Sequence, residues 1–228
     1  MLRPVLPPKL PRRLEPFDAA TLADGATLDG HSLHGELIGG DAEGLELVEC
    51  RLQDVRLTGS RLVRLRLRDV VLERCDLSGV QLDEARFERC SFTDCRLSGA
   101  VLADARLRHV SFETCRLDTA SLRMASLETT RFADCDLEGV DLSGAQLPEC
   151  QLVRCQLTGA DVSGATWRGT ELHGSRLDGV IGVLALREVV IDPLQVADLA
   201  TALLAASGIT VTDEAAFPTS EAPRRSRR

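Results

Sequence analysis

A large apolar residue recurs at every fifth position along most of this chain. From Leu47 to Leu177 all 27 positions at this spacing are apolar: 21 Leu, four Phe, one Val and one Trp. Two residues before each of them stands a residue that is usually small (Ala, Cys, Val, Ser or Thr), and the other three positions carry nearly all the charge. Five residues turn an α-helix by about 140°, and an odd spacing alternates between the two faces of a flat strand. The pattern therefore predicts a chain that turns a corner in every unit.

A second and longer period lies on top of the first, because like residues recur at positions i and i+20. Three residue types share it: Cys75, Cys95, Cys115, Cys135 and Cys155; Phe92, Phe112 and Phe132; Ala85, Ala105, Ala125, Ala145 and Ala165. Like residues that stack in successive layers give such a pattern, so one layer takes up one long period and has four sides. This predicts a solenoid whose regular part has about seven layers and a length of about 33 Å.

The units resemble those of the pentapeptide-repeat family, whose pattern is close to A-(D/N)-L-x-x. The resemblance rests on "CDLSG" from Cys75, "CDLEG" from Cys135, "VDLSG" from Val140 and "ADVSG" from Ala160, and covers about residues 45–180. It implies a right-handed quadrilateral parallel β-helix with the Leu or Phe and the small residue inside. In many units the slot after the small residue holds Arg, Gln or Ser instead of Asp or Asn.

The pattern divides the chain into four parts. Residues 20–182 form the repeat coil, which we expect to be irregular before about residue 45, because Leu28 and Leu33 lie one residue out of register. Residues 1–19 are a Pro-rich basic tail and residues 213–228 a second tail, both expected to be disordered. Residues 183–212 are a C-terminal capping segment.

Within the capping segment a helix is predicted over residues 193–207. Asp192 can cap it, Pro193 suits its first position, and Gly208 can end it. Its apolar residues spread beyond one narrow stripe, so two surfaces are needed to cover them. One is the last coil; the other is a second copy of the chain or the chain's own strand, residues 209–211. The family resemblance also implies a capping or dimerising helix. The candidate residues are Leu194, Val196, Leu199, Leu203 and Leu204.

Composition excludes several function classes. With 35 acidic and 27 basic residues the formal net charge is -8, which argues against general binding of nucleic acid. No apolar run is long enough for a signal peptide or a membrane span, so we expect a cytoplasmic protein with reduced cysteines. Two C-x4-C pairs, Cys90/Cys95 and Cys150/Cys155, have no His in the neighbouring inward slots. We expect free thiols that act as small apolar fillers, and no metal or cofactor.

No nucleophile and base, and no Gly-rich phosphate loop, can be assembled from the pattern, which predicts a non-enzyme. The function expected is a protein-interaction module or scaffold whose outer faces contact another protein. The family resemblance implies an alternative, because some members mimic duplex DNA, bind DNA gyrase or related topoisomerases, and protect them from drugs or toxins.

Charge discriminates between parts of the rod. Residues 45–180 hold 22 acidic and 18 Arg residues, whereas DNA carries about 19 negative charges over about 33 Å. The net charge is +1 over residues 46–108 and -5 over residues 109–180, so only the second half approaches a DNA mimic. Two copies joined through their C-terminal helices would place these acidic halves at the centre. The candidate interaction patch, interrupted by Arg116 and Arg176, is Asp118, Asp136, Glu138, Asp141, Asp161 and Asp178.

The basic half holds a column of its own. Arg66, Arg86 and Arg106 follow one another at the long period and should stack on one side. We expect them to pair with neighbouring acids such as Asp69, Glu84 and Asp104; an acidic partner protein is the alternative.

Overall fold

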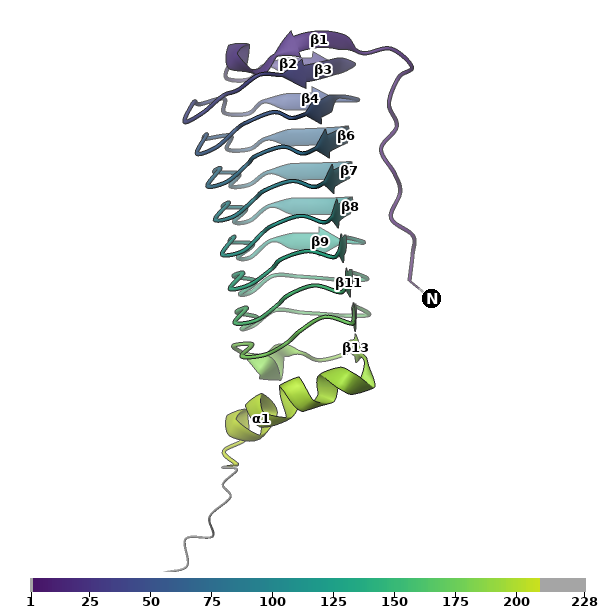
Figure 1. The fold of residues 1–228 in the computed structure, drawn as a ribbon, viewed down its shortest axis with the longest axis vertical. Helices are drawn as coiled ribbons and strands as arrows, with labels where there is room; N and C mark the ends of the chain where they lie inside the picture. The colour runs from purple at the N-terminus through teal and green to yellow at the C-terminus, as the bar shows by residue number, and fades with distance from the viewer. Residues whose placement is uncertain (1, 210–228) are drawn as a thin grey trace, which may run out of the picture.

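The computed structural model describes residues 2–209, which form a rod of stacked coils with a helix across its C-terminal end (Figure 1). The strands are β1 (Glu15–Asp18), β2 (Thr27–Asp29), β3 (His31–His34), β4 (Glu46–Val48), β5 (Arg51–Gln53), β6 (Arg66–Glu73), β7 (Arg86–Thr93), β8 (Arg106–Glu113), β9 (Ser126–Glu128), β10 (Arg131–Ala133), β11 (Gln151–Val153), β12 (Glu171–His173) and β13 (Val190–Ile191). Short 3-10 turns are η1 (Ala19–Thr21), η2 (Val183–Ala185) and η3 (Pro193–Gln195), and the helix is α1 (Val196–Ala206).

Each coil has four faces, which we name A to D in chain order. Strands β6, β7 and β8 run over both face A and face B. Face A carries their first halves together with β4 and β9, and face B carries their second halves together with β5, β10, β11 and β12. Face C is the column of bridges from Glu36 to Arg176, and face D the column from Asp41 to Ile181. From β6 to β12 residue i pairs in parallel with residue i+20, as Arg66 does with Arg86, whereas β12 pairs β13 at i+19. The predicted quadrilateral parallel β-helix is confirmed.

The interior consists of the two apolar columns that the pattern predicted on each face. The Leu, Phe and Trp column and the small-residue column are both buried along the coil. The rings of Phe92 and Phe112 stack with centroids 4.7 Å apart, and those of Phe112 and Phe132 with centroids 4.8 Å apart. This distance equals the spacing of hydrogen-bonded strands, so each aromatic ring rests on the ring of the next coil.

A left-handed residue makes every corner. The last position of each unit, from Glu49 to Gly179, has a φ between 50° and 71° in all 27 units, and only ten of these residues are glycine. An ordinary residue in this conformation costs about 1–2 kcal/mol. The backbone N–H of such a corner residue donates a hydrogen bond to a carbonyl of the next coil, as Asp94 N–H does to Glu113 O at 3.0 Å.

The N-terminal end departs from this regular register. The pairing is i to i+19 for Leu28 and Leu33, which lie beside Leu47 and Leu52, and only i to i+16 for Phe17, which lies beside Leu33. Strand β1 lies inside the segment expected to be a tail, so the coil begins at Glu15 and not at residue 20. Residues 2–14 run back along the outside of the rod (Figure 1).

The C-terminal segment closes the other end. Leu199 is buried in the same core as the coils, and Leu204 is half-buried. The predicted helix over residues 193–207 is present, with its first turn formed as η3. The tail at residues 213–228 and residues 210–211 of the predicted strand lie outside the described residues.

Asp192 is the N-cap of η3, as predicted, with Pro193 after it and Gln195 completing a capping box, and it also binds the last coil. Its carboxylate accepts a hydrogen bond from Gly174 N–H at 2.5 Å and contacts His173 Nδ1 at 3.1 Å, both on the last coil. Gln195 completes the attachment: its Nε2 donates to Ser175 O at 2.6 Å, and its Oε1 accepts from Asp192 N–H at 2.7 Å. The two side chains thus hold the cap on the coil.

The phenylalanine stack should be a main contributor to stability. Phe112→Ala removes a ring that contacts rings on both sides, and we expect the free energy of unfolding in urea to fall by about 3–5 kcal/mol. Phe112→Leu should cost clearly less, because Leu fills the same slot in most units. Equal losses for the two variants would contradict this assignment.

Acid should loosen the C-terminal cap. The Gly174 N–H and His173 hold the pKa of the Asp192 carboxyl below its usual range. A depressed pKa in the folded state stabilises the protein above about pH 4 and loses that effect as the pH falls further. Amide hydrogen exchange in α1 should therefore accelerate on acidification. In the variant Asp192→Asn the amides of α1 should exchange fast already at neutral pH. In the variant Asp178→Asn, which changes a carboxylate on the last coil, they should exchange as in the wild type.

Candidate interaction surface

Six of the seven corners on the edge between faces C and D are glycines, so few side chains project from these corners. The corner residues are Gly59, Gly79, Gly99, Thr119, Gly139, Gly159 and Gly179, all with positive φ. The structure brings the predicted patch together along this C–D edge: Asp118, Asp136, Glu138 and Asp178 lie on face C, and Asp141 and Asp161 on face D. A shallow groove here is lined by Arg116, Asp118, Asp136 and Glu138. The edge is therefore smooth and bordered by carboxylates on both sides.

Two of these carboxylates are held in place by the turn that follows them, at the corner between faces D and A. Asp141 accepts the backbone N–H of Ser143 at 2.8 Å, and Asp161 that of Ser163 at 2.9 Å. Hydrogen bonds from the side chain and backbone of Ser163 lower the pKa of Asp161. An aspartate in this slot also stabilises its turn, which gives it a structural role besides any role in binding.

Cations compensate this patch less than they do the carboxylates on the edge between faces B and C. Within residues 2–209, the sole member of the patch with an Arg, Lys or His nitrogen within 4.0 Å is Asp178, which pairs with Arg176 at 3.3 Å. On the edge between faces B and C, by contrast, Asp54 and Asp134 each receive two hydrogen bonds from an arginine of the next coil, at 2.8 and 2.6 Å respectively. Most carboxylates of the patch thus have no cation in direct contact among the described residues.

The expected pairing of the arginine column is wrong. In the described part of the chain, none of Arg66, Arg86 and Arg106 has a carboxylate within 4.0 Å. Asp69 instead binds Arg89 through two hydrogen bonds of 2.7 and 2.6 Å. The reason is the period: Asp69 stacks on the residue at i+20 in its own column.

The cysteines are buried free thiols, as expected. Cys115 Sγ donates to Phe92 O at 3.5 Å and Glu113 O at 3.3 Å, and Ser175 makes the equivalent bond to Leu152 O at 3.0 Å. Burial raises the pKa of the Cys90 and Cys150 thiols to about 12, so they stay protonated. Among residues 2–209 no cluster of His, Cys, Asp and Glu could hold a metal ion.

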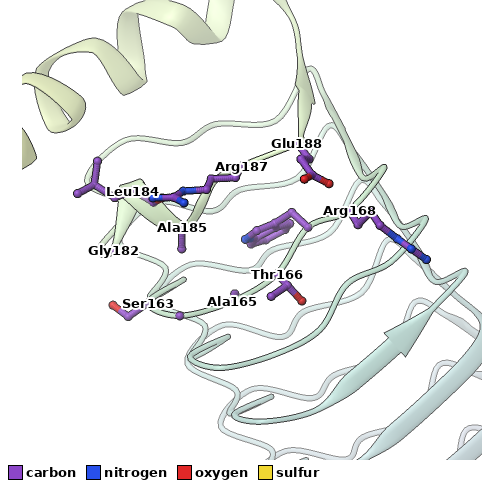
Figure 2. Close-up of a pocket in the computed structure, with 11 residues that line it drawn as sticks. Ser163, Ala165, Thr166, Arg168, Gly182, Leu184, Ala185, Arg187 and Glu188 are labelled. Carbon is purple, nitrogen blue, oxygen red and sulfur yellow. The ribbon is translucent and has the colours of Figure 1, made fainter.

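A pocket opens where the chain leaves the coil (Figure 2). Ser163, Thr166 and Arg168 line one side, and Leu184, Arg187 and Glu188 the other. The Nε1 of Trp167 is buried there without a hydrogen-bond partner among the described residues. The repeat pattern held no signal for this pocket, because it arises where the repeats stop.

The outer side of the cap is apolar. Of the five predicted helix residues, Leu199 is buried against the coil and Leu204 is half-buried, whereas Leu194, Val196 and Leu203 are 89%, 55% and 39% exposed. Ile181 and Leu184 are also exposed at this end. Over residues 2–209 no helix is long and apolar enough to cross a membrane.

Known proteins share both the repeat and the fold. A sequence profile described as the pentapeptide repeat region matches residues 65–123 and 105–181. A trypsin-treated variant of QnrB1, a plasmid-mediated fluoroquinolone resistance protein, superposes with a TM-score of 0.52 at 20% identity, over 78% of this chain and 97% of its own. HetL, a pentapeptide repeat protein involved in heterocyst differentiation regulation in Nostoc sp. strain PCC 7120, gives 0.43 at 24% identity, over 75% and 90%. No curated protein sequence matches the chain.

These comparisons agree with the geometry. The profile covers just over half of the sequence, on the same coils that carry the buried Leu column and the corners. The chain belongs to the pentapeptide-repeat family.

Proposed function

We propose that this protein is a non-catalytic interaction module that binds another protein through the C–D edge. The observation that carries this proposal is the set of carboxylates there without a cationic neighbour among the described residues, on an edge whose glycines let a partner approach the backbone. A surface charge without a local partner contributes mainly to steering and specificity in a complex. The partner expected is therefore a protein with a basic surface.

A second candidate is more specific: the acidic half of the rod takes the place of DNA on a topoisomerase such as DNA gyrase. The likeness in fold to a fluoroquinolone resistance protein motivates it, as does the surplus of acidic residues over residues 109–180. Against it stands the magnitude of the charge, since -5 over half the rod is well below that of a duplex of the same length.

A gyrase supercoiling assay, with and without a fluoroquinolone, distinguishes the two candidates. The variant Asp136→Lys/Glu138→Lys/Asp141→Lys reverses the centre of the patch. The variant Asp83→Lys/Glu84→Lys/Asp104→Lys makes the same change of charge near the edge between faces D and A. If the DNA-mimic candidate is right, the wild type and the second variant should inhibit or protect gyrase, and the first variant should lose the effect.

No effect of the wild type at micromolar concentration would eliminate the gyrase candidate. The general proposal then rests on capture experiments with the same two variants. It predicts proteins that bind the wild type and the D–A variant but not the C–D variant, and it is wrong if both variants capture the same set.

We further propose that two copies associate through the outer side of the cap. Leu194, Val196 and Leu203 form an apolar surface at the end of a rod, where a two-fold contact would join two acidic halves. Leu194→Asp should convert a dimer to a monomer in light scattering. Ile38→Asp, which changes an exposed apolar residue at the other end, should leave the mass unchanged. A monomeric wild type would contradict this proposal.

A further inference from the structure

One of the four edges of the rod is covered. The corner residues between faces A and B are Glu49, Asp69, Arg89, His109, Thr129 and Glu149; all are buried or half-buried. The equivalent residues between faces B and C are Asp54, Arg74, Asp94, Thr114, Asp134 and Arg154; all are exposed. Both sets share the same slot and the same left-handed backbone. The difference comes from residues 2–14, which run beside the rod (Figure 1).

Two contacts fix the position of this segment. Lys9 N–H donates to Asp69 Oδ1 at 3.0 Å, and Arg3 Nε lies 3.5 Å from Glu149 Oε2. Asp69 and Glu149 are four coils apart, which is about 19 Å. The six steps from Arg3 to Lys9 also span about 19 Å at the rise of a polyproline II helix, whereas an α-helix would span about 9 Å. The segment is therefore extended and runs along the rod axis.

The burial of the segment has a period of three. Leu2, Val5, Pro8, Pro11 and Leu14 are half-buried, and the residues between them are exposed except for Leu10. A polyproline II helix has three residues per turn, so every third side chain points the same way, whereas a strand would alternate with a period of two. The prolines at positions 4, 7, 8 and 11 fix φ near the value that this helix requires.

The A–B edge offers hydrogen-bonding groups to the backbone of such a segment. A polyproline II backbone makes no internal hydrogen bonds, and the Asp69 carboxylate, oriented by Arg89, accepts the Lys9 N–H. Further along, Thr129 is 1% exposed, and its Oγ1 and the Nδ1 of His109 are buried without a hydrogen-bond partner among the described residues. The A–B edge thus has a used acceptor, a negative end at Glu149 and two polar groups still available between them.

We propose that the A–B edge is a binding groove for a proline-rich segment in the polyproline II conformation, and that residues 2–14 are its resident ligand. A stiff proline-rich chain loses little conformational entropy on docking, and covalent attachment supplies a high effective concentration. Another proline-rich segment can enter the groove only by displacing residues 2–14. The C–D edge, diagonally opposite, stays free.

The test uses two full-length variants that differ in which side of the segment they change. Val5→Ser/Pro8→Ser/Pro11→Ser alters the side that faces the rod, and Pro4→Ser/Leu6→Ser/Pro7→Ser alters the side that faces solvent. Amide hydrogen exchange at Lys9 should be slow in the wild type and in the outward variant, and fast in the inward variant. Equal exchange in all three proteins would overturn the proposal.

A fluorescent peptide with the sequence of residues 1–15 tests the groove directly. It should bind the inward variant saturably, as measured by fluorescence anisotropy, and should bind the wild type and the outward variant at least about tenfold more weakly. Adding Asp69→Asn to the inward variant should weaken binding by about tenfold, because the acceptor of the Lys9 N–H loses its charge.

Asp134→Asn is the matched control, since Asp134 has the same slot and the same two bonds from an arginine but lies on the exposed B–C edge. It should leave binding unchanged. Failure of the peptide to bind the inward variant, while circular dichroism shows an intact rod, would overturn the proposal, as would equal losses from Asp69→Asn and Asp134→Asn.

Discussion

Hydrogen bonding between successive coils is the interaction on which the rest of this structure depends. Each coil is too small to bury its own apolar residues, and it becomes stable only between two neighbours. The backbone of each coil therefore sets the position of the next at the spacing of parallel strands, and residue i comes to rest on residue i+20. Every column of side chains must then tolerate its own kind, as Phe112 does on Phe92, or a complementary kind, as Asp54 does beside Arg74.

The backbone is nearly the same on all four edges, and so the side chains alone distinguish them. Glycine makes the C–D edge smooth, arginine and aspartate tie the B–C edge together, and the N-terminal segment covers the A–B edge. The ends differ as well: a shortened first coil and strand β1 finish one, and α1 closes the other through Asp192 and Gln195. Recognition by such a rod depends on which edges stay open and with what charge.

The sequence alone determined whatever repeats. The period of five placed Leu47 to Leu177 inside, and the period of 20 placed Phe112 on Phe92 and Asp161 beside Asp141. A repeated backbone makes sequence distance equivalent to position in space, so counting residues was sufficient. The same period relates Asp69 to its partner Arg89, 20 residues further along the chain. The arginines closer in sequence had suggested a different pairing.

Only the tertiary structure decided what does not repeat. The place of residues 2–14 depends on contacts between Lys9 and Asp69 and between Arg3 and Glu149, separated by 60 and 146 positions in the chain. Asp192 is a helix cap, as its sequence context indicates, but only the fold shows that its carboxylate also binds the last coil. No period relates such residues, because their positions follow from the free energy of packing one segment on a finished rod, which becomes visible only once the rod exists.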